Sequence, residues 1–124
     1  MTATDDFFAG LERRGHEPML RRVSASVRWD ILDGDRTEHR LVRIHHGDLR
    51  VTVSEEPADC VIIVERAVCD DVVSGRTSAL AALLRGAAAV DGEFALMVLA
   101  QRLFPRTPGA SAGRAVAAAE ARPS

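Results

Sequence analysis

The sequence contains no lysine, asparagine or tyrosine, and only two cysteines among its 124 residues. Cys60 and Cys69 fit neither a disulfide framework nor a C-x-x-C pair that binds metal or carries out redox chemistry, so both are expected to be small buried thiols. All 16 basic residues are arginine and nearly balance 18 acidic residues, which leaves a net charge of −2. No excess of positive charge therefore indicates nucleic-acid binding.

Long hydrophobic runs are also missing. No apolar stretch approaches the roughly 20 residues that a helix needs to span a bilayer, so no transmembrane segment is expected. The N-terminus, MTATDDFFAG, is acidic and lacks the basic and apolar regions of a secretory signal. These features lead us to expect a soluble, cytoplasmic protein.

The four histidines do not predict a metal site. His39 and His45 share a predicted strand face, but six residues of extended chain separate them by about 20 Å at roughly 3.3 Å per residue. His45 and His46 are adjacent and point to opposite faces, so a site on either would need ligands from elsewhere in the chain. We therefore expect no bound metal.

Motifs of nucleophilic or phosphate chemistry are absent as well. The serines lack a G-x-S-x-G setting, and there is no Gly-rich phosphate loop. The segment VSGRTS, residues 73–78, is better explained as a helix stop followed by a helix cap than as an anion site. We predict that the protein is not an enzyme and uses no cofactor.

In the first half of the chain, the spacing of apolar residues changes from a helical pattern to the alternation of β-strands. Thr4 or Asp5 is predicted to cap a first helix that Gly15 ends. Alternating apolar and polar residues then predict three strands, near residues 23–31, 39–45 and 49–53, which short turns join into an antiparallel meander. One face of this meander should be wet. It would carry Arg28, Arg43 and Arg50 among acidic residues, as a solvated face of mixed charge or, alternatively, as a docking face for an anionic surface or acidic partner.

The second half adds two strands and three helices. Cys60 to Val64 is apolar on both faces and should be a central strand. Gly75 and Gly86 end two short helices, and Ala87 to Val90 forms a short fifth strand before a closing helix. The expected fold is therefore α+β, a five-stranded, twisted, mainly antiparallel sheet covered on one face by helices.

The closing helix is the strongest clue to function. It runs FALMVLA from Phe94 to Ala100 without a polar residue, so its apolar side chains point in almost every direction. A helix that is apolar all round has to be buried on all sides, and 124 residues rarely provide that many layers. A hydrophobic ligand, a second copy in a homodimer, or a partner enzyme could cover the remaining face.

At this point the chain resembles the sterol carrier protein-2 (SCP-2) domain in its small bacterial stand-alone form. The resemblance runs from about Asp5 to Pro105 and rests on VRWDILDG (27–34), HHGDLRVTV (45–53) and LLRGAAAVDGEFALMVLAQRLFP (83–105). It implies a hydrophobic tunnel between sheet and helices that accepts fatty acyl chains, sterols or related lipids. The run Ala87-Ala88-Ala89 and Arg85 depart from the family's usual residues, and sterol is the least favoured ligand for a chain that looks bacterial.

These observations predict a lipid-binding domain over residues 1–105 and a disordered Ala/Pro/Gly/Arg-rich tail over residues 106–124. The alternative function is that of an accessory subunit whose apolar helix surface mediates dimerisation or docking to a partner enzyme. The residues expected to contact a lipid are Trp29, Val72, Leu80, Leu84, Phe94, Met97, Val98 and Leu103.

Overall fold

The first helix, α1 (Ala3–Arg14), begins earlier than the sequence pattern predicts. In the computed structural model, which describes residues 2–104, Thr2 rather than Thr4 or Asp5 is the N-cap. The Thr2 hydroxyl accepts a hydrogen bond from the Asp5 backbone N–H at 3.2 Å, and the Asp5 carboxylate accepts one from the Thr2 N–H at 3.3 Å. This reciprocal capping box satisfies two backbone donors. Gly15, with φ +70°, ends the helix as predicted.

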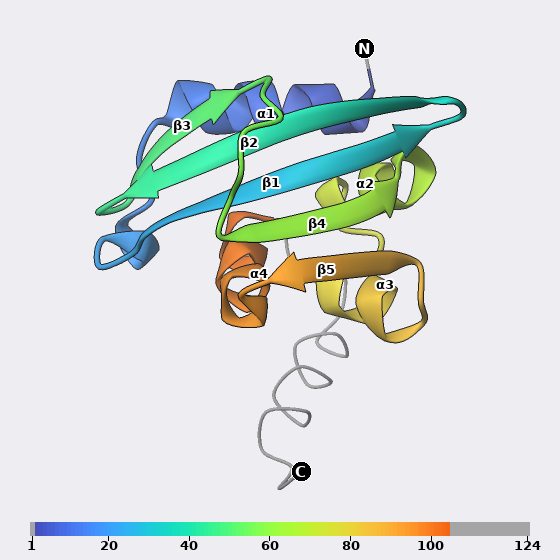
Figure 1. Cartoon of the computed structure of the whole chain (residues 1–124). Coiled ribbons are helices and arrows are strands. Elements are labelled where there is room, and N and C mark those ends of the chain that lie inside the picture. Colours follow the sequence, from blue (N-terminus) through green and yellow to red (C-terminus); the bar gives the residue numbers. More distant parts are fainter. Residues whose placement is uncertain (1, 105–124) are drawn as a thin grey trace, which may run out of the picture.

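The remaining elements follow the predicted order, with a short 3₁₀ helix added after α1 and another after α4 (Figure 1). The tail predicted for residues 106–124 lies outside the described residues. The elements after α1 are η1 (Pro18–Leu20), β1 (Ser24–Asp33), β2 (Arg36–His45), β3 (Asp48–Thr52), β4 (Cys60–Glu65), α2 (Arg66–Val73), α3 (Ala79–Leu84), β5 (Ala88–Gly92), α4 (Phe94–Ala100) and η2 (Gln101–Leu103).

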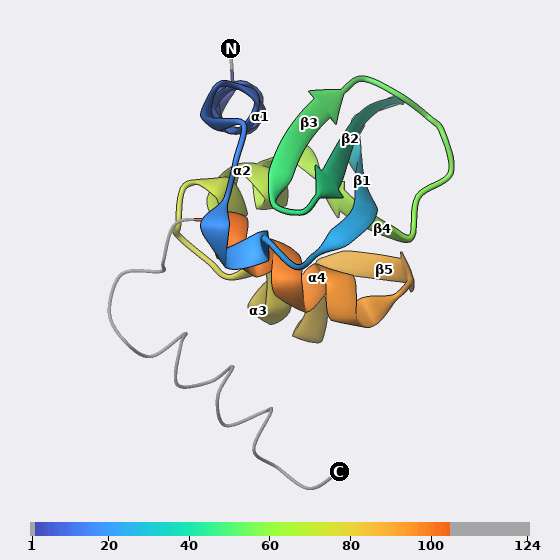
Figure 2. The same cartoon turned by 90° about the vertical axis from the view of Figure 1, so that its left-hand side faces the viewer.

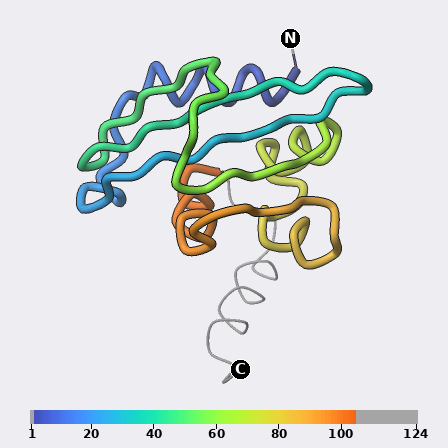
Figure 3. Tube along the Cα trace, viewed as in Figure 1, coloured from blue at the N-terminus to red at the C-terminus, as the bar shows by residue number. Residues whose placement is uncertain are grey.

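The five strands form one sheet in the order β3-β2-β1-β4-β5. β1, β2 and β3 pair antiparallel as the predicted meander, and β4 and β5 also pair antiparallel. β4 is an interior strand, as its apolar sequence predicts, and it runs parallel to β1. A parallel pair requires a crossover, and residues 53–59 provide it by passing from β3 across β2 and β1 on the outer face of the sheet (Figures 1 and 3).

All four α-helices lie on the other, inner face of the sheet (Figure 2). The inner face of β1 carries Val27, Trp29 and Ile31, all at most 3% exposed, because alternate residues of a strand share a face. The core forms between these side chains and the buried sides of α1 to α4. The predicted α+β architecture with helices on one face is confirmed.

The two edges of the sheet differ. At the β3 edge, the Leu49 N–H donates to the Gly15 carbonyl at 2.7 Å, and the Val51 N–H donates to the Glu12 carboxylate at 2.6 Å. The end of α1 therefore satisfies backbone donors that an edge strand would otherwise leave open. No other described strand lies beyond β5 (Figure 1).

We expect Gly92→Ala to destabilise the protein more than Gly34→Ala. Both glycines have a left-handed φ, +100° and +66°, so alanine is strained at either position. A Cβ on Gly92 would in addition lie 2.4 Å from the Asp59 carbonyl oxygen, whereas nothing lies within 4 Å at Gly34. We expect a loss of about 1–2 kcal/mol for Gly34→Ala and more than about 3 kcal/mol for Gly92→Ala in chemical denaturation. Equal losses would contradict the close approach of Gly92 to Asp59.

Candidate ligand-binding site

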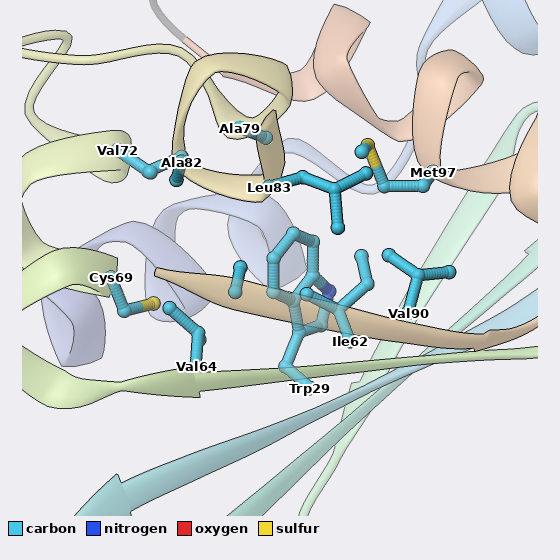
Figure 4. Close-up of a pocket in the computed structure, with 11 residues that line it drawn as sticks. Trp29, Ile62, Val64, Cys69, Val72, Ala79, Ala82, Leu83, Val90 and Met97 are labelled. Atoms are coloured by element: carbon cyan, nitrogen blue, oxygen red, sulfur yellow. The ribbon is translucent and has the colours of Figure 1, made fainter. Parts of the chain in front are cut away.

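An apolar cavity lies between the inner sheet face and helices α2, α3 and α4. All eleven residues that line it carry apolar side chains. Figure 4 shows Trp29 and Ile62 on the sheet side, with Leu83 and Met97 opposite them on the helices. The lining residues are Trp29, Ile62, Val64, Cys69, Val72, Ala79, Ala82, Leu83, Ala88, Val90 and Met97.

The cavity is closed in this conformation. Its free volume is about 10 Å³, which is no more than the space of a single water molecule. Sites that hold a small-molecule ligand usually have roughly 300–1,000 Å³. A lipid can therefore enter only if lining side chains or one of the covering helices move outward.

Two periodicities bring the lining together. In the strands, residues two apart share a face, which places Ile62 with Val64 on β4 and Ala88 with Val90 on β5. In α3, Ala79, Ala82 and Leu83 are three and four positions apart and so lie on the same side of the helix. Small alanine side chains allow α3 to approach the sheet closely.

The structure brings three of the eight predicted contact residues to the cavity: Trp29, Val72 and Met97. Leu80 and Leu103 are buried in the core but do not line the cavity, and Val98 is half-buried. Leu84 and Phe94 are 73% and 47% exposed, so the expectation that they form the cavity wall is corrected.

The error for Leu84 lies in the choice of helix face. The pattern Leu80, Leu83, Leu84 marks one apolar stripe, but the side that faces the sheet carries Ala79, Ala82 and Leu83. Leu84 follows Ala79 by five residues, which is about 140° around the helix at roughly 100° per residue. A stripe drawn through leucines alone gives too little weight to alanine, although small residues are what close packing selects.

Phe94 lies at the start of the closing helix, outside the cavity, on the part that the sequence predicts the domain leaves uncovered. The closing helix is not buried on all sides: Leu96, Met97 and Ala100 are buried, Val98 and Leu99 are half-buried, and Phe94 at its first position is exposed. The α-helix also ends at Ala100 and continues as the 3₁₀ turn η2. The exposed Phe94 is apolar surface that the domain itself leaves open.

The cavity lacks reactive groups. Cys69 is its only thiol and is 1% exposed. Burial raises the pKa of Cys69, which keeps the thiol protonated and weakly nucleophilic. Across residues 2–104 no group of three or more His, Cys, Asp or Glu side chains is placed to hold a metal ion.

A charged cluster closes one end of the inner face. Arg40, opposite Trp29 in the β1–β2 register, donates to the Asp5 carboxylate at 3.1 Å. Arg66 at the start of α2 donates to the Asp33 carboxylate at 2.8 Å, and both arginines also pair with Glu38. These carboxylates compensate both guanidinium groups. The cluster therefore joins α1, α2 and the β1–β2 hairpin and leaves neither arginine free for an anionic headgroup.

The outer sheet face is only partly the open, wet surface that the sequence predicts: Arg43 and Arg50 are exposed, whereas the part around Arg28 is covered by the crossover. Arg28 donates to the Glu55 and Glu56 carbonyl oxygens of the crossover at 3.0 and 2.9 Å. Leu41, which pairs with Arg28 in the register, is only 1% exposed. Arg43 pairs with Glu56. The crossover therefore binds Arg28 and Arg43 of the predicted set, whereas Arg50 is exposed and forms no ion pair among the described residues.

Asp30 is the carboxylate at the centre of this outer-face network. Burial by itself raises its pKa, but hydrogen bonds from Arg28 (2.9 Å) and His39 (2.7 Å) outweigh the burial and hold the pKa of Asp30 below its ordinary value. His39 also contacts Glu55 of the crossover at 3.2 Å. Asp30 thus holds the two side chains, Arg28 and His39, that attach the crossover to the sheet.

We expect Asp30→Asn to lower the free energy of unfolding near neutral pH by about 1–3 kcal/mol, because Arg28 loses a charge-assisted partner. A lowered folded-state pKa contributes stability above the unfolded-state value of about 3.9, and this contribution is lost as the pH falls through the folded-state pKa. The difference between wild type and variant should therefore shrink on acidification in pH-dependent urea unfolding. Asp35→Asn, on an exposed turn, is the control and should show no comparable loss. A difference for Asp30→Asn that stays constant with pH would contradict this role.

Comparison with known proteins gives a consistent result. The sequence pattern of the SCP-2 sterol transfer family matches residues 8–105. No curated protein matches the chain. No helix in the described part of the chain is long and apolar enough to cross a membrane.

Solved structures share the fold. Sterol carrier protein-2 from Aedes aegypti, determined in complex with palmitate, is 19% identical with a TM-score of 0.66, over 82% of this chain and 94% of that one. A conserved hypothetical protein of Thermus thermophilus, described as a possible sterol carrier protein, is 19% identical with a TM-score of 0.60, over 84% and 90%. An inverting sec-alkylsulfatase of Pseudomonas sp. is also 19% identical, with a TM-score of 0.64 over 79% of this chain but only 16% of the enzyme. The fold thus occurs both alone and as a small part of an enzyme.

Proposed function

The chain belongs to the SCP-2 sterol transfer family, and from this premise we propose that it binds one hydrophobic small molecule in the apolar cavity without reacting with it. The ligand class we propose is a fatty acid, an acyl-CoA or another lipid with an extended acyl chain. The observation that carries the proposal is the all-apolar lining between sheet and helices, which has no reactive or metal-binding group among the described residues. The palmitate in the mosquito relative supports the same ligand class.

Transfer of the acyl chain out of water would drive binding. Each buried methylene contributes about 0.8 kcal/mol, so a chain of about ten methylenes gains roughly 8 kcal/mol before any cost is subtracted. The main costs are the opening of the closed cavity and the ordering of the ligand. Because apolar contacts are not directional, one cavity could accept acyl chains of several lengths.

We propose that α3 moves when the ligand enters. Gly75 precedes α3 and Gly86 follows it, and both have φ +79°, a backbone conformation that glycine adopts without strain. Ala79 and Ala82 provide its cavity side with little side-chain volume. Although Leu80 anchors it in the core, this six-residue helix is the shortest of the three covering helices, and we propose it as the one that costs least to displace.

The direct test is native mass spectrometry of protein purified without detergent, followed by solvent extraction and identification of the released compounds. We expect one lipid per chain, either retained from the host or taken up when fatty acid is added. Protein that carries no lipid and does not bind a fluorescent fatty acid would contradict the proposed function.

We expect Met97→Trp to abolish uptake of a fluorescent fatty acid while the protein stays folded. Met97 lines the cavity and is 1% exposed, so the larger indole occupies the ligand's space, at a cost of about 1–3 kcal/mol in stability. Leu84→Trp is the matched control, because it adds a similar side chain on the exposed side of α3 and should leave uptake unchanged. Unchanged uptake by a folded Met97→Trp protein would place the ligand elsewhere.

A further inference from the structure

The outer edge of β5 presents backbone groups that no strand in the described part of the chain satisfies. The Glu93 N–H donates to the Asp59 carbonyl at 2.9 Å, and Gly92 lies opposite Cys60. In an antiparallel pair, residues alternate between those bonded to the neighbouring strand and those that point away. Ala89 and Asp91 therefore bond to β4, whereas the N–H and C=O groups of Ala88 and Val90 point away from the sheet.

This edge has little of the usual protection beyond its short length and one charged residue, Asp91. At the opposite edge, α1 satisfies the β3 donors through Gly15 and Glu12. Edge strands commonly carry charges or proline to prevent pairing, but in β5 the backbone groups of Asp91 face β4 and the run Ala88-Ala89-Val90 is neutral and small. An open strand edge with a neutral run is a template for another strand.

We propose that β5 pairs antiparallel with β5 of a second copy of this chain, about a two-fold axis at Ala89. In this register Ala88 of each copy lies opposite Val90 of the other. Two such residue pairs form, and each exchanges two backbone hydrogen bonds, so the outward-pointing groups of both residues are satisfied in each copy. A two-fold contact uses the same patch on both copies, which is the commonest form of self-association.

Charge and exposure on both sides of β5 favour a second copy as the partner. An antiparallel two-fold places the chain just before β5 in one copy beside the chain just after β5 in the other. Arg85 would lie near Glu93, and the exposed Leu84 near the exposed Phe94. Arg85 donates a hydrogen bond to the Thr77 hydroxyl at 3.1 Å, but neither Arg85 nor Glu93 forms an ion pair within residues 2–104. The flanks of β5 are thus complementary to themselves in both charge and apolar surface.

The contact is short, so its strength is limited. Five residues per strand bury less surface than the roughly 1,200 Å² of a standard stable interface. We therefore expect a reversible dimer whose population rises with protein concentration. The side chains of the pairing residues Ala88 and Val90 line the cavity, whereas the Ala89 side chain at the axis is exposed and does not, so substitutions at Ala89 address the dimer contact without altering the cavity wall.

The test is sedimentation velocity of the full chain from micromolar to millimolar concentration, with Ala89→Lys and Ala89→Glu as variants. Two like charges at the axis should raise the dimer dissociation constant at least about tenfold in either variant alone. An equimolar mixture of the two variants should form a heterodimer and recover the association. Far-ultraviolet circular dichroism checks that each variant is folded. Fatty-acid uptake is measured in parallel, so that loss of the β5–β5 contact can be distinguished from loss of lipid binding.

A charge exchange gives a second, independent test. Arg85→Glu or Glu93→Arg alone should weaken the dimer, and the double variant Arg85→Glu/Glu93→Arg should restore it, since both charges are reversed in each copy. A wild-type protein that is monomeric at every concentration would overturn the proposal. A dimer that the Ala89 variants leave unchanged would also overturn it, because the seam would then lie on another surface.

Discussion

The burial of Trp29 is the contact on which both the core and the cavity depend. Its ring makes edge contacts with Phe8 of α1, at a centroid distance of 6.0 Å, and with Phe104 after η2, at 5.2 Å. Phe7 stacks on Phe104 at 5.0 Å, so the single tryptophan and three of the four phenylalanines form one cluster. On the inner face of the sheet, this cluster joins the first helix to the end of the described chain. Trp29 also forms the sheet side of the cavity, so the cluster fixes the wall against which a ligand would pack.

The crossover on the outer face of the sheet also helps to position the cavity, because it ends beside the start of α4. Arg28 holds the 53–59 crossover to the sheet, and the crossover ends at Asp59. The Asp59 carbonyl accepts from the Glu93 N–H directly before α4, and Gly92 approaches the same carbonyl too closely for a side chain. The position of the closing helix is therefore set by backbone contacts at its start. Gly75, four residues before α3, and Gly86, two residues after it, are the basis for proposing α3 as the cover that moves.

The sequence predicted the architecture well and the site only in part. Strand alternation and glycine helix stops identified the element order, the interior position of β4 and the inner-face residues Val27, Trp29 and Ile31, because these signals are local. The parallel β1–β4 pairing and the crossover over Leu41 are long-range features that no local pattern encodes. The cavity face of α3 was misjudged for a related reason: the shape of the neighbouring strand decides that Ala82, rather than Leu84, faces the sheet.

The most direct measurement of the central claim is the quenching of Trp29 fluorescence by fatty acids brominated at successive chain positions. Trp29 is the only tryptophan in the sequence, so the signal reports the cavity wall alone. We expect saturable quenching at one ligand per chain, strongest for one bromine position and reversed by competition with the unbrominated fatty acid. A brominated fatty acid that binds stoichiometrically to the wild-type protein without quenching Trp29 would contradict binding in this cavity.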